Sequence, residues 1–118
     1  LKDDFLLKGL SKLGSWYFNN FQNSPNRNPL RWSARAVKSF EGYYKHPQSR
    51  SCCYRMDGVG VYNAMKAFRP TGYGLVIGSM SPWVETAALM TGAEKTLTLE
   101  YHPIKSTDPR LDAMHPLG

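Results

Sequence analysis

The chain has 118 residues, a length that fits one domain and leaves little room for a second. Its composition, 42% hydrophobic and 20% charged, excludes a disordered tail, and no apolar run approaches the ~20 residues of a membrane-spanning helix. The net charge of +6 is uneven, because residues 1–74 carry twelve Lys and Arg against four Asp and Glu, whereas residues 75–118 carry three against five. This asymmetry indicates an acidic partner for the first part, although a basic surface is also ordinary for soluble domains.

Residues 1–56 predict a helical and irregular basic region. An amphipathic helix is expected over residues 1–13, with apolar side chains at spacings of four and three: Leu6, Leu10, Leu13 and Tyr17. Its apolar face needs a partner, and packing on a sheet is favoured over binding to an anionic membrane surface. A loop rich in Asn and Pro follows as far as Pro29, and a short helix is expected over residues 32–40 before another irregular stretch.

Residues 57–118 predict a strand–helix–strand core with a helix in front of it. Asp57 is expected to cap that first helix, whose apolar positions are Val61, Met65 and Phe68. Residues 74–78 then form a short apolar run between glycines, which is typical of a strand buried on both faces.

The next helix and strand complete the core. Ser81 is expected as the N-cap, with Pro82 in the first turn, of a helix over residues 82–91 that ends at Gly92. Because crossovers of this kind are right-handed, residues 75–78 and 97–100 are expected to be adjacent parallel strands. The predicted fold class is therefore α/β, in which N-terminal helices precede a βαβ unit.

The carboxyl ends of the two predicted strands are where such a unit binds ligands. Gly78 precedes Glu100 by 22 residues, close to the ~20 expected between a glycine turn and the acidic residue that accepts hydrogen bonds from ribose hydroxyls. A dinucleotide turn would need further glycines where Met80 and Trp83 stand, so a nucleoside without a pyrophosphate fits better. A βαβ unit that binds nothing at these residues remains the alternative.

A longer set of residues carries a family resemblance. It comprises residues 75–85, with the string Gly-Ser-Met-Ser-Pro-Trp-Val-Glu, followed by Gly92-Ala93, by residues 97–101 and by Pro109-Arg110-Leu111. Together they resemble the family called domain of unknown function 268, which looks like a divergent branch of the S-adenosylmethionine-dependent methyltransferase fold, a Rossmann fold. The resemblance covers roughly residues 57–111.

The resemblance implies a cofactor site for S-adenosylmethionine. Carried over by position, Gly78 and Ser79 line the methionine part, Ser81 belongs to the same turn, Glu100 holds the ribose hydroxyls, and Tyr101 flanks the adenine. Methyltransferase sheets have more strands than this chain supplies after Glu100, so we expect a truncated methyltransferase-like domain. Since methyl transfer depends on aligning donor and acceptor, we expect weak cofactor binding and little or no activity from this length of chain.

The alternative function is a non-catalytic basic domain that binds nucleic acid or a partner protein. Four basic residues alternate with aromatic ones that would stack on bases: Arg27, Arg31, Arg35 and Lys38 with Trp32, Phe40, Tyr43 and Tyr44. Packing of these aromatic side chains in a core is the favoured interpretation.

The remaining candidate residues predict little chemistry. His46, His102 and His115 share no metal-ligand spacing, and we expect His102 on the surface rather than as a general base. The neighbouring Cys52 and Cys53 are expected as reduced thiols, which favours a cytoplasmic location. Because two parallel strands bury little core and leave unpaired edges, we also expect a homo-oligomer.

Overall fold

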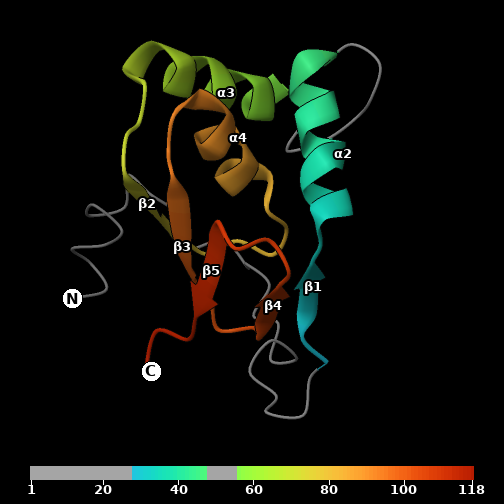
Figure 1. The fold of residues 1–118 in the computed structure, drawn as a ribbon, viewed down its shortest axis with the longest axis vertical. Helices are drawn as coiled ribbons and strands as arrows, with labels where there is room; N and C mark the ends of the chain where they lie inside the picture. The colour runs from blue at the N-terminus through green and yellow to red at the C-terminus, as the bar shows by residue number, and fades with distance from the viewer. Residues whose placement is uncertain (1–27, 48–55) are drawn as a thin grey trace, which may run out of the picture.

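The computed structural model describes residues 28–47 and 56–118 as a mixed arrangement of helices and parallel strands (Figure 1). In chain order its elements are β1 (Leu30–Trp32), α2 (Ala34–Lys45), α3 (Met56–Phe68), β2 (Tyr73–Ile77), α4 (Trp83–Thr91), β3 (Lys95–Leu99), β4 (Ile104–Ser106) and β5 (Leu111–Met114). The α/β class predicted from the sequence is confirmed at this level. The helix predicted over residues 1–13 lies outside the described residues.

The strands form two parallel sheets. One has the order β2-β3-β5, and the other pairs β1 with β4. Leu75 pairs with Leu97 and Ile77 with Leu99, so the predicted parallel pairing of the two core strands is confirmed. In Figure 1, β4 lies between β5 and β1, which places the two sheets side by side.

Helix α4 is the central layer. It packs on β2 and β3 on one side and on α2 and α3 on the other. Its middle residues Glu85, Thr86, Ala87 and Ala88 are buried, and the small ones among them allow neighbouring elements to approach closely. Gly92 ends the helix as predicted, with its N–H donating to the carbonyl of Ala88 at a φ of 137° that favours glycine.

Among the described residues, two clusters of buried side chains form the core. One contains Trp32, Val37 and Leu111, and the other contains Tyr43, Tyr44 and Ala87. Tyr44 stacks on Tyr62 with ring centroids 4.8 Å apart, and its hydroxyl donates to the carbonyl of Trp83. Burial raises the pKa of Tyr44 well above its ordinary range. Trp32, Tyr43 and Tyr44 are buried in these clusters, as the favoured interpretation predicted.

The helix predicted over residues 32–40 is displaced. Trp32 ends strand β1, where it is paired with Ser106, and the helix begins only at Ala34 and continues to Lys45. Ser33 is the N-cap and accepts a hydrogen bond from the N–H of Ala36. Because Trp32 and Ser106 are 74 positions apart, their pairing leaves no local sequence pattern, which explains the error.

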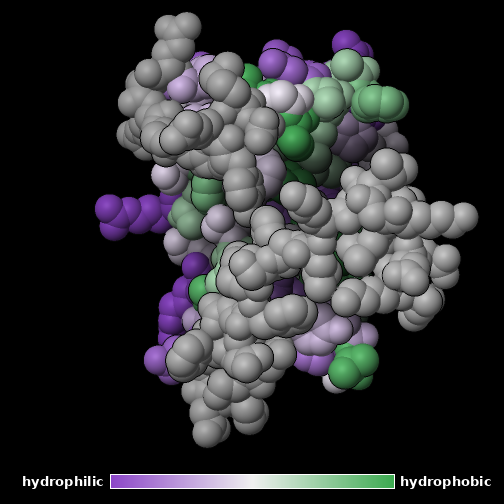
Figure 2. All heavy atoms as spheres, turned by 180° about the vertical axis from the view of Figure 1, so that it is seen from behind, coloured by the Kyte–Doolittle hydropathy of each residue, from purple (hydrophilic) through white to green (hydrophobic). Residues whose placement is uncertain are grey.

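Other expectations are wrong in detail. Helix α3 begins at Met56, so Asp57 lies inside it, and Phe68 is 88% exposed. Seen from behind, hydrophobic side chains gather at the end of the molecule where α3 lies (Figure 2).

Strand β2 is not buried on both faces, because Leu75 and Ile77 are 62% and 77% exposed. Pro82, not Ser81, occupies the N-cap of α4, and no side chain caps that helix.

Candidate functional site

The Glu100 carboxylate lies at the point where β3 ends and is held by two backbone groups. Oε2 accepts a hydrogen bond from the N–H of Ser79 at 3.2 Å, and Oε1 accepts one from the N–H of His102 at 3.0 Å. Ser79 belongs to the turn after β2, the parallel neighbour of β3. The structure therefore brings the predicted turn and the predicted acidic residue together.

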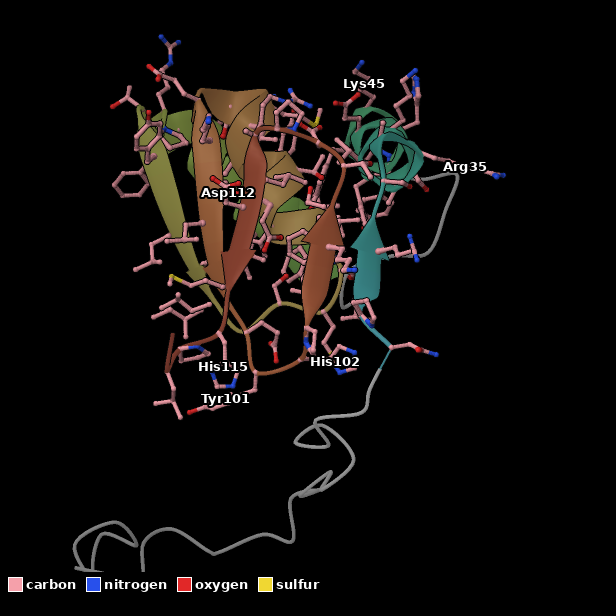
Figure 3. All side chains as sticks on the ribbon, turned by 60° about the horizontal axis from the view of Figure 1, so that its bottom comes forward. Arg35, Lys45, Tyr101, His102, Asp112 and His115 are labelled. Atoms are coloured by element: carbon pink, nitrogen blue, oxygen red, sulfur yellow. The ribbon has the colours of Figure 1, made fainter. Side chains whose placement is uncertain are left out.

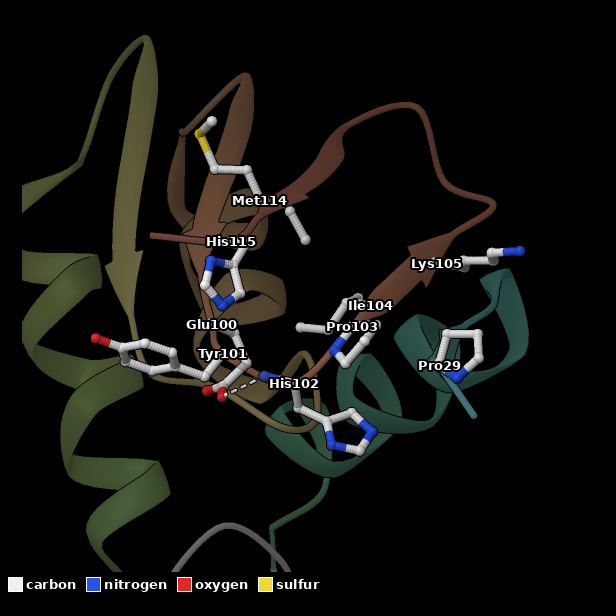
Figure 4. Close-up of a pocket in the computed structure, with 10 residues that line it drawn as sticks. Pro29, Glu100, Tyr101, His102, Pro103, Ile104, Lys105, Met114 and His115 are labelled. Carbon is white, nitrogen blue, oxygen red and sulfur yellow. Dashed lines mark hydrogen bonds between the residues drawn. The ribbon is translucent and has the colours of Figure 1, made fainter. Parts of the chain in front are cut away.

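A pocket of about 420 Å³ opens beside Glu100 at the carboxyl ends of β3 and β5 (Figure 4). Ten residues line it: Pro29, Glu100, Tyr101, His102, Pro103, Ile104, Lys105, Ala113, Met114 and His115. The rings of Tyr101 and His115 meet edge to face, with centroids 5.2 Å apart. His115 Nδ1 accepts a hydrogen bond from the N–H of Leu117, so the neutral imidazole carries its proton on Nε2.

The Ser79 side chain points into the protein, away from this pocket. Its Oγ lies 2.9 Å from the carbonyl oxygen of Ser81 and 3.2 Å from Oε2 of Glu85, which also accepts a hydrogen bond from Thr98 at Oε1. A hydroxyl has one proton and can donate to only one of its two neighbours. Burial raises the pKa of Glu85. When the Glu85 carboxyl is protonated, its proton can donate to Ser79 Oγ and leave the Ser79 proton for the carbonyl of Ser81.

The predicted cofactor residues divide into two groups. Glu100 and Tyr101 line the pocket, whereas Gly78, Ser79 and Ser81 do not. Gly78 is exposed with a φ of 74°, and the carbonyl of Ser81 turns back to Ser79 and Trp83. The roles given to these three residues toward the methionine part stay predictions.

Sequence reasoning missed the wall that β5 contributes. Met114 ends that strand and His115 follows it, and the chain reaches β5 from the short strand β4 with no helix between them. Residues 111–114 read Leu-Asp-Ala-Met, an alternation of apolar and polar positions too short to distinguish from a loop. Asp108-Pro109 is the signal in the sequence that a turn precedes it.

His102 is a correction to the sequence prediction. It is buried rather than on the surface, and its Nε2 lies 3.1 Å from the carbonyl oxygen of Asn28. Because a carbonyl only accepts, the ring donates through Nε2. This hydrogen bond joins the segment before β1 to the segment after β3. Within residues 28–47 and 56–118, no three side chains of His, Cys, Asp or Glu gather as metal ligands.

Several further expectations stay predictions. Arg31, Arg35 and Lys38 are exposed, but nothing in the structure tests binding to nucleic acid, and Arg27 lies outside the described residues. Figure 3 shows Arg35 and Lys45 projecting from α2, away from the sheet. Cys52 and Cys53 also lie outside the described residues, so the thiol state and the cytoplasmic location are untested. Among the described helices, none has the length and apolar character needed to cross a membrane.

The comparison with family models covers the second part of the chain. Residues 71–117 match the family described as Caenorhabditis protein of unknown function, DUF268. No curated protein and no solved structure matches the chain. The matched segment runs from just before β2 to just beyond β5 and includes Glu100, Tyr101 and His115. The match therefore supports the resemblance of this segment to DUF268.

Proposed function

We propose that this chain carries a nucleoside-binding βαβ unit of the Rossmann methyltransferase type, in which Glu100 accepts hydrogen bonds from the ribose hydroxyls of S-adenosylmethionine. One observation supports this most. The Glu100 carboxylate stands at the carboxyl end of β3, is held by the turn that follows the adjacent parallel strand, and borders a pocket. Ligands of open α/β sheets bind in this position.

The residues around the pocket fit the nucleoside part of such a cofactor. A carboxylate has about four acceptor positions, and the N–H groups of Ser79 and His102 occupy two of them, which leaves acceptor capacity for two ribose hydroxyls. Tyr101 and His115 offer aromatic faces and edges against which a purine packs. Met114 and Ile104 add an apolar surface.

The residues that line the pocket hold the nucleoside part of the cofactor, and Gly78, Ser79 and Ser81 lie outside that lining. The Ser79 hydroxyl contacts Ser81 and Glu85, so Ser79 holds Glu100 through its backbone N–H and not through its side chain. When bound, S-adenosylmethionine supplies an activated methyl group. The role of this chain's residues is to bind the ribose and to pack against the adenine.

Titration with adenosine and with S-adenosylhomocysteine tests the proposal. Because weak binding is expected, chemical-shift changes of backbone amides at millimolar ligand are the appropriate measurement. Perturbations should concentrate at Glu100, Tyr101 and His115. Glu100→Gln removes the charged acceptor and should weaken binding by ~1–3 kcal/mol, roughly 5- to 150-fold. Glu94→Gln is the control, because Glu94 is an exposed carboxylate on the loop before β3.

A ligand without ribose hydroxyls identifies the contact. The unmodified protein should bind 2′,3′-dideoxyadenosine more weakly than adenosine, and the Glu100→Gln variant should bind the two nearly equally. Equal binding of both nucleosides by the unmodified protein contradicts the role of Glu100. Absence of any localised shift with all three ligands contradicts the nucleoside site itself and leaves the βαβ unit as a scaffold.

A further inference from the structure

The β2-β3-β5 sheet has one covered face and one uncovered face. Residues at alternate positions, among them Thr96, Thr98 and Leu111, are buried on the side of α4. The other alternate positions form the open sheet face, which consists of Tyr73, Leu75, Ile77, Lys95, Leu97, Leu99, Asp112 and Met114. In Figure 3 the helices lie behind this sheet, and Asp112 is labelled on the strands in front of them.

This face is apolar and accessible. Tyr73 and Ile77 are 76% and 77% exposed, and Leu75 and Met114 are exposed as well. Apolar patches on adjacent strands are unusual on the surface of a monomer and mark sites of association. Strand β2 also ends the sheet, so its outer backbone groups lack a strand partner within the described residues.

Strand register arranges the face as a grid of three rows. The first row is Tyr73 and Lys95, the second is Leu75, Leu97 and Asp112, and the third is Ile77, Leu99 and Met114. Lys95 therefore stands one row above Leu97 on the same strand, whereas Asp112 stands one strand beside Leu97 in the same row. A hollow of about 360 Å³ lies between Tyr73, Leu97 and these two charges.

We propose that the open sheet face binds the same face of a second copy of this chain, with the strands of the two sheets crossing near right angles. The two-fold axis runs in the plane of the interface, along the diagonal through Ile77 and Leu97, so that the strands of one copy lie along the rows of the other. It brings Lys95 of each copy against Asp112 of the other, so the only two charges of the face are paired. Orthogonal crossing is one of the two common ways in which sheets pack.

The same axis also matches the apolar residues. Leu97 and Ile77 each meet their own counterpart, Leu75 meets Leu99 of the second copy, and Tyr73 meets Met114, a favourable contact between an aromatic ring and sulfur. Neither of the other simple orientations, with strands parallel or antiparallel across the interface, pairs the charges, because Lys95 or Asp112 then faces a leucine. The face is small, so we expect a weak dimer with a dissociation constant of about 1–100 μM.

Charge reversal tests the arrangement. Lys95→Glu sets a glutamate against Asp112 of the other copy, and Asp112→Lys sets two lysines together, so each variant alone should dimerise at least ~10-fold more weakly by analytical ultracentrifugation. An equimolar mixture of the two variants should dimerise again, because every charge contact then joins opposite signs. A chain carrying both substitutions should also regain the dimer. Lys38→Glu makes the same change of charge on exposed α2 and should have no effect.

Each outcome decides the question. If Lys95 and Asp112 interact only within one chain, both single variants lose that interaction and mixing them does not restore it. Failure of the mixture to dimerise therefore overturns the proposal. A wild-type monomer at all concentrations up to about 1 mM, ten times the upper limit of the expected dissociation constant, overturns it too. In that case residues 1–13, whose sequence predicts an apolar helical face, become the candidate cover. Circular dichroism of the variants checks that these exposed substitutions leave the fold unchanged.

Discussion

The N–H of Ser79 donates a hydrogen bond to the Glu100 carboxylate across 21 residues. The two residues meet because β2 and β3 are parallel neighbours whose carboxyl ends lie at the same edge of the sheet, while α4 crosses over between them. Below this contact the Ser79 hydroxyl joins the buried Glu85. One serine thus connects a carboxylate that borders a pocket to a carboxylate in the core.

Glu85→Gln should change how stability depends on pH. Burial raises the pKa of Glu85 above its ordinary 4.5, so the folded protein holds this proton more tightly than the unfolded chain does. The stability that this provides is complete below pH 4.5 and is lost as the pH rises through the folded-state pKa. Urea denaturation at several pH values should therefore show the wild-type protein losing stability relative to Glu85→Gln as the pH rises above 4.5.

A matched change at an exposed carboxylate provides the control for this experiment. Glu94→Gln removes an exposed charge and should shift the stability by little at any pH in the same range. If the difference between the wild-type protein and Glu85→Gln is constant with pH, the Glu85 carboxyl titrates alike in the folded and unfolded states. The proposed donation from Glu85 to Ser79 is then wrong.

Two neighbouring threonines on β3 should respond to valine in opposite directions. Thr96 Oγ1 is buried and has no hydrogen-bond partner among the described residues, whereas Thr98 Oγ1 donates to Glu85 at 2.7 Å. Thr96→Val removes an unpaired polar atom and should stabilise the fold by about 1 kcal/mol. Thr98→Val leaves a carboxyl oxygen without its donor and should destabilise it by ~1–3 kcal/mol. Equal effects in thermal denaturation contradict this assignment.

The sequence predicted the βαβ core of this fold better than the elements around it. The core strands, the crossover helix and its Gly92 end follow from an apolar run, a turn and a helical stretch that succeed one another along the chain. The meeting of Ser79 with Glu100 follows from that order alone, because parallel strands connected by one helix must end at the same edge.

The elements around the βαβ core depend on contacts between residues that are distant in the sequence. Trp32 reads as part of a helix with the residues after it, but its pairing with Ser106 places it in a strand. Leu75 and Ile77 read as buried because the sequence does not reveal that, among the described residues, helices cover only the other face of the sheet. His115 lacks any motif and reaches the pocket only because β5 pairs with β3. Each of these errors concerns a neighbour that periodicity does not encode.

Two glycines with positive φ should differ in their tolerance of alanine. A Cβ on Gly92 would lie 2.4 Å from the carbonyl oxygen of Pro70, whereas a Cβ on Gly78 would meet nothing within 4 Å. Gly78→Ala adds only the cost of the left-handed backbone, roughly 1–2 kcal/mol. Gly92→Ala adds a backbone collision and should cost more than that, so its melting temperature should be the lower of the two. A smaller loss for Gly92→Ala contradicts the tight contact of α4 with Pro70.

Asp108→Asn should loosen the turn that leads from β4 to β5. Asp108 accepts hydrogen bonds from the N–H and Nε of Arg110 at 3.0 Å and from its terminal nitrogen at 2.8 Å, and the Arg110 side chain holds the pKa of Asp108 below its ordinary 3.8. Asparagine keeps an acceptor but loses the charge, so the variant should be less stable by about 1 kcal/mol at pH 7.

The pH dependence separates this charge effect from a change of shape. Since the pKa of Asp108 is lowered by folding, its stabilising contribution is complete above pH 3.8 and is lost as the pH falls through the folded-state pKa. Wild-type protein and Asp108→Asn should therefore differ in unfolding free energy at pH 7 and converge as the pH falls below 3.8. A difference that persists unchanged in acid indicates that asparagine distorts the turn. Arg110→Gln removes the same pair from the other side and should give the same convergence, because it leaves the Asp108 backbone contacts with Ser106 in place.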